Sequence, residues 1–207
     1  MNIFFARHGE SQANLLHEIS NRGLKHPLTE KGRRQAFQLA QALRRRDITR
    51  IYSSPVLRAL ETTILMANRL GVEYEIAAAL REYDLGDLEG QADEKTWQSW
   101  RELFDAWTKY QRWDKRAPGG ESFHEVRERF VPFIEGLIRQ YRDTPANLLC
   151  LGHGGLYWVM LPLVLKNIDY DFISSHPLDY ATAVVSQLSA DGLFCLEWNG
   201  VQVTPAG

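Results

Sequence analysis

Cysteine and long hydrophobic runs are scarce in this sequence of 207 residues. The only cysteines, Cys150 and Cys195, stand in apolar stretches, so we interpret them as reduced core thiols and exclude a small disulfide-stapled scaffold. The apolar start at residues 3–6 meets Arg7 at once, which makes it too short for a signal sequence or a membrane span. We therefore expect a cytoplasmic protein that does not bind a membrane.

Neither sign of charge is in excess, because 24 Lys and Arg residues stand against 26 Asp and Glu residues, for a formal net charge of -2. This balance gives no global positive field, so we expect no nucleic-acid partner. We interpret the arginine run at 44–46 as the solvated end of a helix. Any site for an anion must be a local cluster. The length and the 44% of hydrophobic residues predict a single domain over residues 1–207.

Short apolar segments alternate with stretches of helical spacing along the chain. Residues 2–6, 50–52 and 147–151 are typical of buried parallel strands, because each is a brief run rich in apolar residues. Apolar residues at helical spacing lie between these segments, and Ser54 and Ser122 are predicted N-caps. Strands that alternate with helices predict a parallel sheet covered by helices.

Two extended segments close the chain. Residues 181–188 and 193–198 are separated by a turn that contains Asp191 and Gly192, which is typical of an antiparallel hairpin. The predicted fold class is therefore α/β: a three-layer α/β/α sandwich whose mixed sheet is mostly parallel, with an antiparallel edge strand.

Aromatic residues concentrate between Lys95 and Arg116, a stretch that holds four of the six tryptophans. Their spacings of three and four predict an amphipathic helix, and a Pro-Gly-Gly turn follows at 118–120. We predict a helical, aromatic-rich insertion at about 91–120 that forms a flap over a site. The spacing leaves open whether these rings face the pocket or the core.

Two histidines stand directly after predicted strands. His8 lies in an RHG tripeptide after the first strand, and His153 lies in a GHG tripeptide after the strand at 147–151. Ligands bind at the carboxyl ends of parallel strands, and glycine lets the backbone approach a ligand closely, so these contexts indicate a functional site. Arg58 stands in the helix predicted after Ser54, where free amides and the helix dipole favour an anion such as phosphate.

Further short motifs accompany these residues in a fixed order. Together they resemble the histidine phosphatase superfamily, also called phosphoglycerate mutase-like, over nearly the whole chain. The motifs are RHGES at 7–11 with Asn14, PLT at 27–29, SSP at 53–55 with Arg58 and Ala59, Glu82 with Gly86, PGGES at 118–122 and HGG at 153–155. An isolated RHG is a weak signal, whereas this ordered set is specific.

The resemblance implies catalysis through a phosphohistidine on His8. The neutral His8 ring would attack phosphorus while a backbone carbonyl holds its other ring nitrogen. Arg7, Arg58 and His153 would surround the phosphoryl oxygens, and Glu82 would protonate the leaving group and later activate water.

The same resemblance implies contacts to phosphate or substrate from Asn14, Ser20, Asn21 and Gly154. No histidines stand at metal-ligand spacing in the sequence. We therefore expect no metal and no cofactor, since arginines and histidines supply the positive charge that phosphoryl transfer requires.

The resemblance leaves more than one activity open. Mutases of this family carry an Arg-His-Tyr run after the acidic residue, where this chain has Tyr-Asp-Leu at 83–85. They also carry adjacent arginines in the insertion, whereas Arg112 and Arg116 here are separated by three residues. We therefore predict a metal-independent phosphomonoesterase of the histidine acid phosphatase type, acting on a small phosphorylated metabolite. A phosphoglycerate mutase and a non-catalytic phosphate-binding relative are the alternatives, and the oligomeric state stays open.

Overall fold

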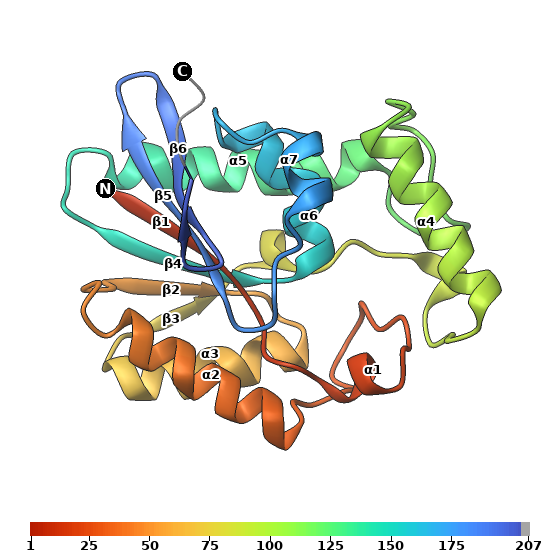
Figure 1. The fold of residues 1–207 in the computed structure, drawn as a ribbon, viewed down its shortest axis with the longest axis horizontal. Helices are drawn as coiled ribbons and strands as arrows, with labels where there is room; N and C mark the ends of the chain where they lie inside the picture. The colour runs from red at the N-terminus through yellow and green to blue at the C-terminus, as the bar shows by residue number, and fades with distance from the viewer. Residues whose placement is uncertain (204–207) are drawn as a thin grey trace.

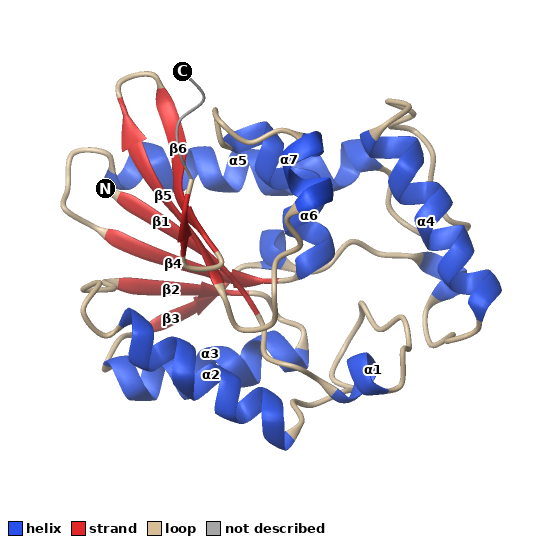
Figure 2. Cartoon of the chain, in the orientation of Figure 1, coloured by secondary structure: helices blue, strands red, loops and turns tan. Residues whose placement is uncertain are grey.

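One seven-stranded sheet organises the chain in the computed structural model, which describes residues 1–203 (Figures 1 and 2). The strands are β1 Asn2–Arg7, β2 Arg50–Ser53, β3 Tyr74–Ile76, β4 Asn147–Gly152, β5 Ala183–Ser189, β6 Gly192–Trp198 and β7 Val201–Gln202. The α-helices are α1 Gln12–Leu15, α2 Glu30–Leu43, α3 Leu57–Leu70, α4 Glu94–Thr108, α5 Phe123–Tyr141, α6 Gly154–Val164 and α7 Tyr170–Ser175. Short 3-10 helices cover Ala78–Leu80 and Gly86–Leu88.

The sheet order is β3-β2-β4-β1-β5-β6-β7. β4 pairs in parallel with both β1 and β2, and β2 pairs in parallel with β3. At the other side, β5 runs antiparallel to β1, and β6 and β7 continue this antiparallel order. The predicted mixed sheet with an antiparallel edge is therefore confirmed. That edge contains three strands instead of one, because β5 and β6 form the predicted hairpin and β7 pairs with β6.

Side chains on the central strands alternate between two hydrophobic cores. On β1, Ile3 and Phe5 belong to the core formed with α5 and α6, whereas Phe4 and Ala6 belong to the core formed with α2 and α3. This alternation is the period of two expected for a pleated strand that is buried on both faces. Helices cover both faces of the sheet (Figure 1), so the predicted three-layer α/β/α sandwich is confirmed.

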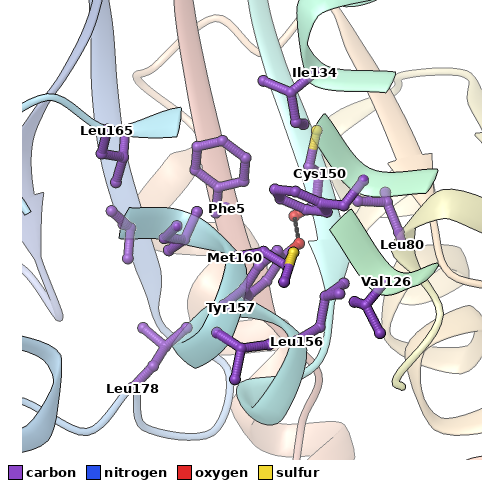
Figure 3. Packing of buried hydrophobic residues seen from close by; sticks show 14 of the residues in the cluster. Phe5, Leu80, Val126, Ile134, Cys150, Leu156, Tyr157, Met160, Leu165 and Leu178 are labelled. Atoms are coloured by element: carbon purple, nitrogen blue, oxygen red, sulfur yellow. Dashed lines mark hydrogen bonds between the residues drawn. The ribbon is translucent and has the colours of Figure 1, made fainter. Parts of the chain in front are cut away.

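The larger core fixes helix α6 against strand β4 (Figure 3). Tyr157 of α6 is fully buried, and its hydroxyl donates a 2.7 Å hydrogen bond to the carbonyl oxygen of Cys150. A buried hydroxyl without a partner would be destabilising, so this bond favours one placement of the helix. The turn between β4 and α6, which contains His153, is thereby held in place.

Two helix boundaries differ from the prediction made from sequence. α3 begins at Leu57 with Val56 as its N-cap, because the Ser54 hydroxyl is occupied by His153 and by the Val56 amide. α4 ends at Thr108, and Gln111 beyond it takes a left-handed φ of 53°, so the helix does not extend to residue 116. Ser122, in contrast, is the predicted N-cap of α5.

The sheet brings both histidine tripeptides to one edge. Arg7 at the end of β1 is paired with Gly152 at the end of β4, so the residues that follow them, His8 and His153, leave the sheet side by side. The α1 and α4 segments lie beyond this end of the parallel strands (Figure 1). Every helix within residues 1–203 is too short or too polar to cross a lipid bilayer.

Candidate active site

A cavity of about 250 Å³ lies where β1 and β4 end. Its lining includes eight of the nine residues singled out from the sequence: Arg7, His8, Asn14, Ser20, Asn21, Arg58, Glu82 and Gly154. These residues come from the end of β1 and the turn after it, from α1 and the loop after it, from the start of α3, from the loop between the two 3-10 helices and from the start of α6. His153 is the exception, because it lies behind His8 and does not line the cavity.

The His8 ring is held in one tautomer by its two hydrogen-bond partners. Its Nδ1 lies 2.7 Å from the carbonyl oxygen of Gly9, which can only accept, and its Nε2 lies 2.9 Å from Nε of Arg58, which can only donate. The proton therefore sits on Nδ1, and Nε2 carries a lone pair. Burial lowers the pKa of His8 well below its ordinary value, and the charges of Arg58 and Arg7 lower it further. His8 is thus a neutral imidazole whose Nε2 lone pair accepts a hydrogen bond from Arg58.

Arg58 lies in the first turn of α3 and reaches across to the turn after β1. Besides Nε on His8, its Nη1 donates to the backbone carbonyl of Ser20 at 2.5 Å. Burial lowers the pKa of Arg58 to about 10, so the guanidinium stays charged at neutral pH.

Arg7 provides a second cation at the same end of the cavity. Its Nη1 donates to the carbonyl oxygen of Leu178 at 2.7 Å, and its guanidinium lies 3.9 Å from the centre of the Tyr180 ring. Nε of Arg7 is buried and has no hydrogen-bond partner within residues 1–203. Because such a donor is costly to leave unpaired, this atom is suited to an anion that enters the cavity.

His153 packs edge-on against His8, with ring centroids 5.1 Å apart. Its Nε2 is 2.7 Å from the Ser54 hydroxyl oxygen, and its Nδ1 is buried with no partner in the described chain. Burial and the Arg58 charge hold the pKa of His153 well below its ordinary value. His153 is therefore a neutral neighbour of the nucleophile candidate.

Glu82 is a buried carboxyl group that lines the same cavity. Its Oε2 accepts from the Gly155 backbone amide at 3.0 Å, and its Oε1 accepts from the Tyr83 amide at 3.1 Å. Burial raises the pKa of Glu82, against the opposing influence of the Arg58 charge and these two amides. A raised pKa favours the protonated form, which is the form that a proton donor needs.

The loop that carries Glu82 is held by a partly buried ion pair between Arg129 and Glu121. Nη1 of Arg129 on α5 donates to the carbonyl oxygens of Ala79 and Arg81, at 2.7 and 3.0 Å. Glu121 accepts from the guanidinium groups of both Arg129 and Arg81 and from the Asp84 amide. These contacts hold the backbone on both sides of Glu82, so the loop cannot shift without breaking charged hydrogen bonds.

Two consecutive glycines at the start of α6 leave room for the site. A Cβ on Gly154 would lie 3.0 Å from Nε of Arg7, and a Cβ on Gly155 would lie 2.9 Å from each carboxylate oxygen of Glu82. Both distances are shorter than an ordinary van der Waals contact of a Cβ atom, so glycine is favoured at both positions because it has no side chain.

Asn14 and Asn21 line the cavity, but their polar groups already hold the neighbouring backbone. Oδ1 of Asn14 accepts from the amide and hydroxyl of Ser11, and Nδ2 of Asn21 donates to the Tyr83 carbonyl at 2.7 Å. Ser20 offers its backbone carbonyl to Arg58. These three residues thus shape the cavity wall in the structure, and their contacts to a substrate stay a prediction.

Three residues of the site were not found from the sequence. Tyr180 lies against the Arg7 guanidinium, Trp158 of α6 lines the cavity, and Ser54 holds His153. Tyr180 and Trp158 belong to no motif, and their neighbours in sequence do not distinguish them from core aromatics. Ser54 does stand in the SSP motif, but its position before a predicted helix favoured a capping role.

The aromatic residues at 97–113 divide between the cavity and the protein interior. Trp97 and Trp100 line the cavity. Trp107 is buried in the core against Tyr83 and Phe123, and Trp113 stacks on the outer side of Phe123. In the first half of the segment the tryptophans therefore face the cavity, and in the second half they pack against the core residue Phe123.

Known proteins are similar to this chain in sequence and in fold. The sequence profile of the histidine phosphatase superfamily (branch 1) matches residues 3–200. The "Probable phosphoglycerate mutase GpmB" of Cronobacter sakazakii is 33% identical over 162 residues, which cover 74% of this chain and 70% of that protein. The glucosyl-3-phosphoglycerate phosphatase of Mycolicibacterium vanbaalenii is 33% identical over 160 residues, or 74% of this chain and 69% of that protein.

A solved structure with the same fold is the alpha-ribazole phosphatase from Shigella flexneri, with a TM-score of 0.78 and 23% identity over 99% of this chain and 100% of that chain. This chain belongs to the histidine phosphatase superfamily.

Proposed function

We propose that this protein is a metal-independent phosphomonoesterase that hydrolyses a small phosphorylated metabolite through a phosphohistidine on His8. The observation that carries the proposal is the state of His8, whose Nε2 lone pair lies beside Arg58 at the end of a cavity that also contains a buried Glu82. A nucleophile, cations for a phosphoryl group and a proton donor thus share one cavity. The phosphatase name of one relative supports the same class of reaction.

In the first step, Nε2 of His8 attacks phosphorus and the bond from phosphorus to the ester oxygen breaks. Glu82 gives its proton to that oxygen, so the alcohol leaves neutral and Glu82 becomes a carboxylate. Arg58 turns its donors from Nε2 to the phosphoryl oxygens, where Arg7 also donates. The buried, unpartnered Nε of Arg7 supports this role.

In the second step, a water molecule replaces the alcohol. The Glu82 carboxylate takes one proton from this water while its oxygen attacks phosphorus. The bond between phosphorus and Nε2 breaks, and the electron pair returns to His8. Inorganic phosphate leaves, and His8 and Glu82 regain their starting protonation states.

The positions of the flap arginines favour hydrolysis over a mutase reaction on phosphoglycerate. Such a mutase must hold the carboxylate of its substrate, and Arg112 and Arg116 were the candidates in the segment at 91–120. Neither lines the cavity, and Arg116 is paired with Glu125 on α5. We include in the proposal that α4 acts as a flap over the cavity within a single domain, since Trp97 and Trp100 form part of its wall.

The test is to trap the covalent intermediate. Wild-type protein is mixed with 4-nitrophenyl phosphate in the presence of a chelator, quenched in denaturant at high pH, and weighed intact by mass spectrometry. We expect one phosphoryl group per chain that is lost in acid, as for a phosphorus–nitrogen bond. His8→Ala should carry no such group and should lose turnover by a factor on the order of 10⁴ or more.

His124→Ala is the matched control, because His124 is a partly exposed histidine outside the cavity. It should form the intermediate as wild type does. An unchanged phosphoryl level in His8→Ala would overturn the assignment of the nucleophile. Loss of all activity in the chelator, restored by a divalent cation, would overturn the metal-independent mechanism.

A further inference from the structure

The end of the cavity away from His8 is poor in positive charge. Within residues 1–203, Arg7 and Arg58 are the only arginines or lysines in its lining, and both lie at the phosphate end beside His8 or Tyr180. The outer lining instead contains Glu18, whose carboxylate is held by Lys25 and His26. A substrate with a second anionic group would therefore meet no arginine or lysine of the described lining that is not already at the phosphate end, and the one nearby lysine, Lys25, is paired with Glu18. Anions that are buried without a partner are unfavourable.

The same end of the cavity has a wall of indole rings. Trp97 and Trp100 come from α4 and Trp158 comes from α6, and the ring centroids of Trp100 lie 5.7 Å from Trp97 and 6.4 Å from Trp158. Each of these rings is partly exposed. Rings at these separations form a continuous apolar surface that reaches across two helices.

Hydrogen bonds inside the protein fix two of the three indoles. Nε1 of Trp97 donates to the carbonyl oxygen of His17 at 2.7 Å, and Nε1 of Trp100 donates to the Tyr83 hydroxyl at 2.7 Å. Their polar atoms are therefore already used, and what they offer a substrate is carbon surface. A rigid aromatic wall binds a ring without an added ordering cost, because it is preorganised.

Taken with the proposed function, on which this inference rests, these observations assign a class of substrate. We infer that the alcohol portion of the substrate is an uncharged ring with an apolar face, which stacks on Trp97, Trp100 and Trp158 and carries no second anionic group. An aromatic ring and the apolar face of a sugar ring share this chemistry. The volume and the lining of the cavity suit both an aromatic ring and a sugar ring.

A panel of matched esters tests the inference. Benzyl phosphate, 4-carboxybenzyl phosphate and ethyl phosphate present the same kind of primary alcohol to Glu82 but differ in the ring and in its charge. We expect kcat/KM for benzyl phosphate to exceed that for each of the other two by about tenfold, as one or two aromatic contacts would give. A hexose 6-phosphate in the same panel distinguishes a sugar ring from an aromatic one.

Two substitutions of one residue locate the effect. Trp97→Ala should lower kcat/KM for benzyl phosphate about threefold to tenfold and leave that for ethyl phosphate near its starting value. Trp97→Arg should add a cation to the outer cavity and raise the ratio of carboxybenzyl to benzyl phosphate hydrolysis. Trp113→Ala is the matched control, because this flap tryptophan is outside the cavity and stacks on Phe123. It should leave all the ratios unchanged.

The outcomes separate this inference from the proposed function. Equal kcat/KM values for the three esters, or faster hydrolysis of the carboxybenzyl ester, would overturn the inferred substrate class while hydrolysis itself stands. Equal changes in Trp97→Ala and Trp113→Ala would also overturn it, because the effect would then be structural. Failure to hydrolyse any ester, including 4-nitrophenyl phosphate, would overturn the proposed function and the inference with it.

Discussion

Nε of Arg58 donates a 2.9 Å hydrogen bond to Nε2 of His8, the nitrogen that the proposed reaction requires as nucleophile. The guanidinium therefore occupies the lone pair in the free protein and must release it when a phosphoryl group arrives. Burial lowers the pKa of His8 most and the Arg58 charge lowers it further, so the ring stays neutral. In the proposed reaction the same guanidinium then binds the charged oxygens of the substrate.

Replacing Arg58 by glutamine should weaken both effects. We expect turnover of 4-nitrophenyl phosphate to fall on the order of 10² to 10³, the loss seen when one donor to a transition-state anion is removed. Because the Arg58 charge lowers the pKa of His8, its removal should move the acidic limb of the pH–rate profile to higher pH. Arg69→Gln, on the exposed side of the same helix, is the control. An acidic limb at the wild-type position would contradict the proposed coupling.

Glu82→Gln should affect esters according to their leaving groups. An alkoxide is a poor leaving group and needs a proton, whereas 4-nitrophenolate does not. We expect kcat/KM for ethyl phosphate to fall on the order of 10² to 10⁴, and that for 4-nitrophenyl phosphate by less than about tenfold, because kcat/KM reports the first step and not the later attack of water that also uses Glu82. Glu102→Gln, an exposed glutamate on α4, is the control. Equal losses for the two esters would remove Glu82 from the role of acid.

The pH dependence of the first step follows from two shifts of opposite direction. Burial lowers the pKa of His8, so its neutral form persists into acidic solution, and burial raises the pKa of Glu82, so its protonated form persists towards neutral pH. Activity on ethyl phosphate should be highest at pH values between the pKa of His8 and the pKa of Glu82, and it should fall as pH rises through the pKa of Glu82. In Glu82→Gln the alkaline limb should disappear, because glutamine does not titrate. Ionisation of the substrate affects both proteins equally, so a difference between their two profiles reports Glu82. A limb that persists unchanged would contradict the assignment.

Gly155→Ala should disturb Glu82 without changing any functional group. The added methyl would lie 2.9 Å from both carboxylate oxygens, so the carboxyl group must move, and a displacement near 1 Å can lower the rate about 10²-fold. The loss should be larger for ethyl than for 4-nitrophenyl phosphate, as for Glu82→Gln.

Gly136→Ala is the matched control for this prediction. Gly136 is inside α5, and its added methyl would approach only the flexible end of Arg139, at 3.9 Å. It should keep full activity and raise the free energy of unfolding by about 0.5 to 1 kcal/mol, because alanine favours a helix. If Gly155→Ala keeps full activity on ethyl phosphate, the room at this glycine is not needed by Glu82.

The parts of the site that follow strand ends could be predicted from the sequence. The apolar run before His8 identifies β1, and the run before His153 identifies β4, so a parallel sheet places both histidines at its carboxyl edge. Their meeting also requires that β1 and β4 are neighbours, which the structure shows. The N-cap of α5 at Ser122 was equally predictable, since its capping box is local.

Other features depend on contacts that no local pattern contains. Tyr180 lies in a loop between α7 and β5 and reaches Arg7 only because β5 pairs with β1. The end of α4 at Thr108 departs from the helical spacing that continues to Trp113, because Trp107 donates its indole hydrogen to the Lys115 carbonyl across the turn. The hydroxyl of Ser54 binds a histidine 99 residues away, so its distant partner prevails over the capping role.

The position of β1 in the sheet has a consequence for biosynthesis. Asn2 pairs with Asn147 on one side and with Gln187 on the other, so β1 has no neighbour in the sheet until β4 has left the ribosome. The nascent chain must keep this apolar strand unpaired for most of translation, and contacts so distant in sequence form slowly. The cavity beside His8 can therefore form only after β4 and α6 are made, and a translation product truncated before β4 would contain His8 but lack the wall that α6 contributes.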